Sequence, residues 1–153
     1  FDSGLGGLTV VGEITRALPD ESIIYVGDTV RCPYGPREPS EVREFVLQIG
    51  RWLTGQRVKL IVIACNTATA AGLALAQSVF EVPVIGVVEP GARAAVKSTV
   101  NRRVGVIGTL GTVNSGAYST AVRALDAGVT VFSAATPRFV DVVEQGLRLG
   151  GTA

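Results

Sequence analysis

The chain has 153 residues, of which 47% are hydrophobic and 18% are charged, and its formal net charge is +1. This length suffices for one domain with a core, its apolar runs are shorter than the roughly 18 residues of a membrane span, and its charges form no basic stripe for nucleic acid. We therefore expect a soluble cytoplasmic protein with no membrane or nucleic-acid partner, and the absence of histidine excludes a Ser-His or Cys-His catalytic pair.

Short β-branched runs alternate with amphipathic stretches, a pattern typical of repeated βαβ units. We expect strands at 22–26, 58–63, 82–87, 103–107 and 129–133, and helices at 7–18, 40–53, 69–80, 90–100, 113–125 and 138–147. Together they predict an α/β fold with a doubly wound, flavodoxin-like parallel sheet and helices on both faces. A single domain over residues 1–153 accounts for the pattern, and we expect both of its ends to be truncated. Helical spacing predicts one buried face made of Val42, Phe45, Val46, Ile49, Trp52 and Leu53.

The first polar loop carries Asp2 and Ser3 before three glycines at positions 4, 6 and 7. In a parallel sheet the loops after the strands meet at one edge, where ligands bind. Glycines let the backbone approach a ligand closely, and the helix that follows offers free N–H groups to an anion. The spacing is not that of a dinucleotide-binding loop, and an Asp turn with a Ser cap is an equally open alternative.

The second loop contains Pro33, Tyr34 and Gly35, which predict a rigid turn. Tyr34 could contact a ligand there, although a tight turn with a half-buried ring is the slightly favoured alternative. Cys32 lies in the same loop and is expected to have no role of its own.

Cys65 follows the apolar run 60–63 and precedes an Ala-rich helix, so its thiol lies at the predicted edge of the sheet. The N-terminal N–H groups of that helix favour a thiolate, which predicts that Cys65, and not Cys32, has a lowered pKa. The alternative is a small buried hydrophobic residue, the usual role of a free cysteine.

Three later features complete the candidate edge. Residues 89–91 (Glu-Pro-Gly) are expected to form a loop, and the loop 108–115 offers Thr109 and Thr112 before a helix, which suits an anion or merely caps that helix. Glu144 is predicted in the last turn of a helix, where an acid is unfavourable for the helix dipole, and this position suggests a role.

Six segments in chain order then show a resemblance that covers nearly the whole chain. They are 1–9 (Phe-Asp-Ser-Gly-Leu-Gly-Gly-Leu-Thr), 25–29 (Tyr-Val-Gly-Asp-Thr), 33–35 (Pro-Tyr-Gly), 64–68 (Ala-Cys-Asn-Thr-Ala), 89–91 (Glu-Pro-Gly) and 105–109 (Gly-Val-Ile-Gly-Thr). The chain resembles the glutamate racemases of the aspartate/glutamate racemase superfamily. This resemblance implies a cofactor-independent racemase, homodimeric when complete, that interconverts L- and D-glutamate and supplies D-glutamate for peptidoglycan.

The resemblance also implies roles for particular residues. It places catalytic groups at Cys65, Asp2 and Glu144, and substrate contacts at Asp2, Ser3, Tyr34, Gly35, Asn66 and Thr67, to which we add Thr109 and Thr112. The family's second catalytic cysteine, in a Gly-Cys-Thr-His-Tyr-Pro segment of a second domain, is absent from this sequence. Inversion at Cα needs an acid/base group on each face of the substrate, so we expect the chain alone to be inactive.

Two alternatives stay open. A racemase of aspartate or another small amino acid would share the chemistry. A noncatalytic domain that binds an anion or nucleotide would use residues 108–115 instead.

Overall fold

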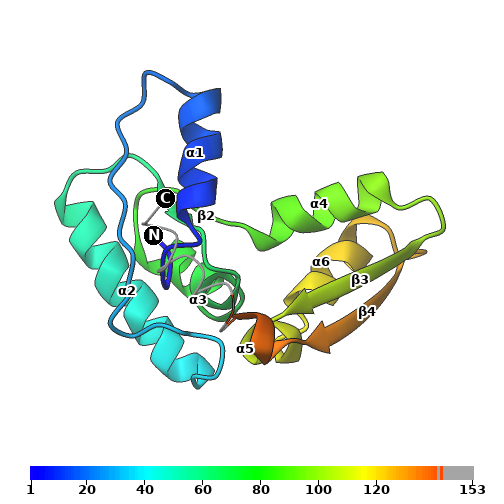
Figure 1. Ribbon diagram of the computed structural model, residues 1–153. Coiled ribbons are helices and arrows are strands. Elements are labelled where there is room, and N and C mark those ends of the chain that lie inside the picture. Colours follow the sequence, from blue (N-terminus) through cyan, green and yellow to red (C-terminus); the bar gives the residue numbers. More distant parts are fainter. Residues whose placement is uncertain (141, 143–153) are drawn as a thin grey trace, which may run out of the picture.

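The computed structural model describes residues 1–140 and 142, and it has helices and parallel strands in alternation (Figure 1). The elements are α1 (Leu8–Ala17), α2 (Pro39–Gly55), β1 (Ile61–Ile63), α3 (Asn66–Val79), β2 (Val84–Gly86), α4 (Val88–Ser98), β3 (Arg103–Gly108), α5 (Leu110–Asn114), α6 (Ala117–Leu125) and β4 (Thr130–Ala135). The predicted α/β class is confirmed. No helix among the described residues is both long and apolar enough to cross a membrane.

The named strands pair in two parallel sets. β1 pairs with β2 from Ile61 opposite Val84, and β3 pairs with β4 from Arg103 opposite Thr130. Parallel partners require a crossover, and α3 supplies it for the first pair. Within each pair the two strands run in the same direction, so the polar loops that follow them lie at the same edge.

Phe1 and Asp2 add a further parallel rung beside β1. The Phe1 amino group donates a hydrogen bond to the Val62 carbonyl at 2.7 Å, and the Ala64 N–H donates to the Phe1 carbonyl at 2.8 Å. On the other side, Asp2 exchanges two backbone hydrogen bonds with the segment 26–28. The first two residues thus join β1 to the loop that contains Asp28.

The strand expected at 22–26 is wrong. This segment is irregular and makes one isolated bridge, between Asp2 and Gly27. Ile23 and Ile24 are 38% and 45% exposed. A strand needs a paired neighbour, and before Gly27 this segment faces a cavity of about 540 Å³ that separates it from residues 58–62. Its β-branched composition was therefore a poor guide to its conformation.

Three helix boundaries also differ from expectation. α3 begins at Asn66, three residues early, because Cys65 caps it. The helix expected at 113–125 is two helices, α5 and α6, separated at Gly116, whose φ of 65° is left-handed. Residues 89–91 were expected to form a loop, but they lie in the first turn of α4, where a proline is tolerated.

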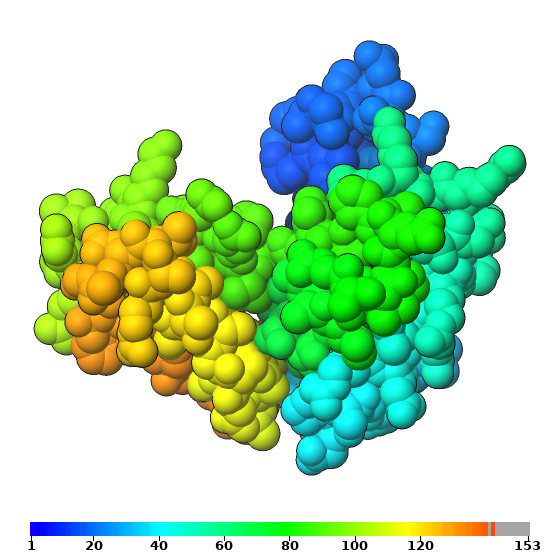
Figure 2. All heavy atoms as spheres, turned by 180° about the vertical axis from the view of Figure 1, so that it is seen from behind, coloured from blue at the N-terminus to red at the C-terminus, as the bar shows by residue number. Residues whose placement is uncertain are grey.

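Buried apolar side chains form two clusters, which correspond to two bodies. In the first, the α2 face packs against α3 and β1, and the predicted face is confirmed except for Trp52, which is 52% exposed. In the second, α4 and α6 cover β3 and β4 around Ala92 and Val122. Figure 2 shows the second body (yellow to orange) beside α2 and α3 (cyan to green), with α1 (blue) projecting above.

Candidate functional site

The two bodies meet at a cavity of about 360 Å³ that collects most of the residues singled out in the sequence. Its lining includes Asp2, Ser3, Tyr34, Gly35, Cys65, Asn66, Thr67 and Thr109, together with Tyr118. Thr112 bonds to two of these threonines. Glu144 lies outside the described residues.

Cys65 is the N-cap of α3 and is only 7% exposed. The Ala68 N–H donates to its Sγ at 3.4 Å. Burial raises the pKa of the Cys65 thiol, and the charge of Asp2 adds to this, whereas hydrogen bonds from the Ser3 side chain and the Ala68 N–H act in the opposite direction. The predicted lowered pKa is therefore wrong: the N–H groups at the start of α3 do favour the thiolate, but desolvation outweighs their effect.

Asp2 fits both interpretations of its loop, as a residue that shapes the turn and as a charged group near the thiol. Its Oδ2 accepts hydrogen bonds from the N–H groups of Gly4 (3.2 Å) and Gly7 (2.9 Å), so it fixes the turn that starts α1. A Cβ on Gly7 would lie 2.6 Å from the Asp2 Cβ, so only glycine fits there. The same carboxylate acts on Cys65 through its charge. Asp2 is thus both a turn residue and part of the electrostatic environment of the thiol.

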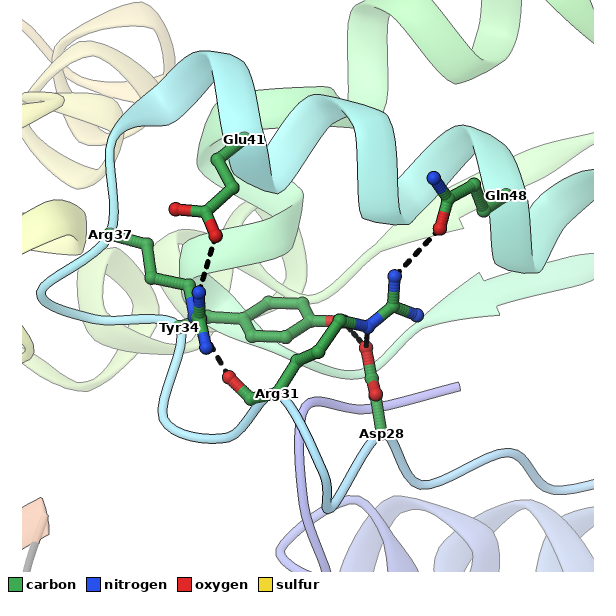
Figure 3. A network of polar contacts seen from close by, with 6 residues as sticks. All are labelled: Asp28, Arg31, Tyr34, Arg37, Glu41 and Gln48. Carbon is green, nitrogen blue, oxygen red and sulfur yellow. Dashed lines mark hydrogen bonds and ion pairs between the residues drawn. The ribbon is translucent and has the colours of Figure 1, made fainter.

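Tyr34 lines the cavity but is only 1% exposed, and its hydroxyl is engaged by Asp28. It donates to the Asp28 carboxylate, which is paired with Arg31 at 2.5 Å (Figure 3). Burial and this bond raise the pKa of Tyr34, so it stays a neutral donor. Arg31 also reaches Gln48 at 2.7 Å, and Arg37 donates to the Arg31 carbonyl while pairing with Glu41. The Tyr34 ring is more deeply buried than the half-buried ring expected for a tight turn. The network in Figure 3 holds the turn rigid.

Gly35 places the backbone of this turn against the second body. Its carbonyl accepts the Gly111 N–H at 2.9 Å. A Cβ on Gly35 would lie 2.5 Å from the Thr109 Cβ. A side chain at position 35 would therefore push Thr109 away from the cavity.

Three threonine hydroxyls close a ring between the two bodies. The hydroxyl of Thr67, in the first turn of α3, lies 2.8 Å from the Thr109 hydroxyl and 3.2 Å from the Thr112 hydroxyl. Thr109 and Thr112 are 3.0 Å apart, and Thr109 caps α5 by accepting the Thr112 N–H. The expected loop 108–115 is thus mostly the short helix α5 with Thr109 as its cap, and of the three threonines Thr67 and Thr109 line the cavity of Cys65, whereas Thr112 is not among its lining residues. Three rotatable hydroxyls form a donor set suited to a carboxylate.

Tyr118 was missed from the sequence. Its hydroxyl donates to the Asn66 Oδ1 at 2.8 Å, which joins α6 to α3 over 52 residues of sequence. The sequence shows Tyr118 only as part of an amphipathic helix, and no local pattern predicts its contact with Asn66. Among the described residues, no group of three or more His, Cys, Asp or Glu side chains is placed to hold a metal ion.

Comparisons with known proteins agree with this geometry. A family model described as Asp/Glu/Hydantoin racemase matches residues 6–151. Glutamate racemase of Oceanobacillus iheyensis is 53% identical over 153 residues, which are 100% of this chain and 56% of that protein. The crystal structure of a glutamate racemase isoform from Bacillus anthracis has a TM-score of 0.92 and 52% identity, over 96% of this chain and 55% of that one.

A third similar protein carries a ligand. The crystal structure of glutamate racemase from Francisella tularensis in complex with D-glutamate has a TM-score of 0.88 and 38% identity, over 96% of this chain and 55% of that one. In each case the chain spans about half the length of the protein it matches.

Proposed function

The chain belongs to the Asp/Glu/hydantoin racemase family, and on that premise we propose that the complete protein is a cofactor-independent glutamate racemase. Cys65 is then one of its two acid/base groups. The observation that carries the proposal is the position of the Cys65 thiol on a polar cavity, between the Ser3 side chain and the N–H groups that open α3.

The proposed reaction moves one proton at each face of the substrate Cα. The Cys65 thiolate takes the α-proton from one face and becomes a thiol. A second thiol, in the part of the complete protein outside residues 1–153, gives its proton to the opposite face and becomes a thiolate, so protons and charge balance. The configuration at Cα is thereby inverted, which a single group on one face cannot do.

The raised pKa of Cys65 fits this role. A thiolate that is poorly solvated in a buried site is a stronger base than one in water, and the α-proton of an amino acid is weakly acidic. Ser3 and the Ala68 N–H limit the cost of forming the anion. We therefore assign Ser3 to the support of the thiolate as well as to substrate contact.

Substrate carboxylates are proposed to bind to the hydroxyls of Thr67, Thr109 and Thr112 and to the Asn66 amide. The ring of threonine bonds has to open, because each hydroxyl must turn its proton toward the ligand. Tyr34 contributes through its rigid turn and the Gly35 backbone, since its hydroxyl is held by Asp28. A catalytic role for Glu144 and a homodimeric assembly stay predictions, as does the supply of D-glutamate to peptidoglycan synthesis in the cytoplasm.

The alternatives have less support. The similar protein with D-glutamate bound favours glutamate over aspartate. The nucleotide-binding alternative depends on residues 108–115, but α5 has five residues and its first N–H groups are partly used by the Thr109 cap. A helix this short offers little dipole to a phosphate.

The test is the Cys65→Ser variant of the complete protein, with Cys32→Ser as its matched control. We expect racemisation of L- and D-glutamate to fall by about 10²-fold or more, the order expected for loss of a general base. The Cys32 variant should keep its rate. Solvent deuterium exchange at Cα of one enantiomer should survive in the Cys65 variant, since the other thiol still serves its own face. Near-normal racemisation in both directions by Cys65→Ser would rule out the assignment.

A further inference from the structure

Tyr118 and Asn66 form a polar contact that the proposed chemistry does not yet use. Tyr118 comes from α6 in the second body and Asn66 from the first turn of α3, directly after Cys65. The Tyr118 hydroxyl donates to the Asn66 Oδ1 at 2.8 Å, and both residues line the cavity of Cys65.

Gly91 explains how the tyrosine reaches this position. A Cβ at residue 91 would lie 2.9 Å from the Tyr118 hydroxyl and 3.1 Å from its Cε1, so the ring lies directly against the first turn of α4. Any larger residue there would push the ring from α4. The Glu-Pro-Gly segment, which the sequence singled out without a function, therefore makes room for Tyr118.

The hydrogen bond decides which end of the Asn66 amide faces the cavity. A carboxamide has one accepting oxygen and two N–H donors on its nitrogen. Because the oxygen is held by Tyr118, the nitrogen is directed elsewhere, and within residues 1–140 and 142 it makes no hydrogen bond to the protein. Burial raises the pKa of Tyr118, so the hydroxyl keeps the proton it donates.

We propose that Tyr118 is a positioning residue that holds the Asn66 carboxamide with its N–H groups toward a substrate carboxylate or the anion formed at Cα. This inference rests on the proposed racemase function. A free amide would present its oxygen to an anion part of the time, which is repulsive. The Tyr118 bond removes that orientation, and it requires α6 to lie within hydrogen-bond reach of the first turn of α3.

The test is a double-mutant cycle in the complete protein, using Tyr118→Phe and Asn66→Ala with L- and D-glutamate. Tyr118→Phe keeps the ring and removes the hydroxyl, and we expect kcat/KM to fall by about 3- to 10-fold, the range for loss of one neutral hydrogen bond. In the Asn66→Ala background the same change should have no further effect on kcat/KM. A residue that served only stability would lower the melting temperature equally in both backgrounds and leave kcat/KM unchanged.

Gly91→Ala provides a second route, because it displaces the ring without removing the hydroxyl. Its loss of kcat/KM should match that of Tyr118→Phe and should vanish in the Tyr118→Phe background. Full kcat/KM in Tyr118→Phe, or losses that multiply independently with Asn66→Ala, would overturn the positioning role and leave the racemase intact. A complete wild-type protein that does not racemise glutamate would overturn the proposed function, and the positioning role with it.

Discussion

The ionisation of Cys65 depends on a balance between burial and a few named neighbours. Since the thiolate is the form that reacts with alkylating agents, the rate of modification against pH reports the pKa of the thiol. We predict that in a Cys32→Ala variant the midpoint for iodoacetamide labelling of Cys65 lies above the ordinary value for a thiol. The unfolded protein in denaturant is the internal control and should return to that value. A midpoint below it in the folded protein would contradict the dominance of burial.

Two neighbours of the thiol should shift this midpoint in opposite directions. Ser3 stabilises the thiolate by a hydrogen bond, so Ser3→Ala should raise the pKa of Cys65. Asp2 destabilises the thiolate by its charge, so Asp2→Asn should lower the pKa, while an Asn oxygen can still accept from the Gly7 N–H. Labelling profiles of both variants in the Cys32→Ala background measure the shifts. Shifts of the same sign would show that the loop moves as a whole.

At the scale of a helix, two mid-helix glycines offer a matched pair. Gly12 in α1 is exposed, and a Cβ there meets nothing within 4 Å, whereas a Cβ on Gly50 in α2 would lie 2.3 Å from the Phe80 ring. Gly12→Ala should stabilise the fold by about 0.5–1 kcal/mol through helix propensity. Gly50→Ala should destabilise it by about 1–3 kcal/mol through overpacking. Urea denaturation of both variants measures the difference, and equal effects would mean that α2 and Phe80 separate without cost.

The cavity of about 540 Å³ beside Phe1, between residues 22–25 and 58–62, allows a test of strand pairing. A variant extended before Phe1 by about five apolar residues, the usual length of a strand, can continue the parallel rung between residues 22–25 and β1. We expect a gain of roughly 2 kcal/mol in the free energy of unfolding, the order for burying one aliphatic side chain. A Gly-Ser extension of equal length is the control and should give little gain in the free energy of unfolding.

The gain from this extension should also depend on pH. In a chain that is produced to begin at Phe1, burial lowers the pKa of the Phe1 amino group, so the folded chain binds this proton less tightly than the unfolded chain does. Stability is therefore lost as pH falls from the ordinary amine range of about 8 through the lowered value. The extension replaces the amine by an amide that can still donate to Val62, so its gain should be larger at pH 6 than at pH 9. A gain independent of pH would show that the amine carries no such cost.

Elements whose stability is local were predictable from sequence, and elements that need a distant partner were not. The face of α2 followed from helical spacing, and only Trp52 at its margin was misplaced, because the packing of α3 and β1 leaves it exposed. The segment 22–26 has strand composition, but pairing is a property of two segments, and among the described residues it is Asp2 that pairs with its end.

The whole molecule shows the same division in its site. Cys65, Asp2 and Thr109 could be placed at one edge because parallel strands end together, and the cavity does bring them together. The pKa of Cys65 was predicted in the wrong direction, because burial is a sum over surroundings that one loop does not contain. Tyr118 was missed since its contact with Asn66 exists only once α6 packs near α3.

The chain of residues 1–153 by itself is expected to fold but not to racemise glutamate. Folding is expected because α2, α3 and β1 enclose one buried cluster, and α4 and α6 cover β3 and β4 around another. Racemisation should be absent because inversion needs a second group opposite Cys65. Cys32 cannot supply it, since Cys32 is not among the residues that line the cavity.

The measurement is a cooperative unfolding transition of this chain, followed by the optical rotation of L-glutamate over hours, with the complete protein as positive control. The complete protein should lose the rotation as the racemate forms, and residues 1–153 should leave it constant. If the folded chain instead turned over glutamate, and Cys65→Ala abolished that turnover, one thiol would suffice. The second proton would then have to come from solvent or from a group such as Asp2, and the two-thiol mechanism would be wrong.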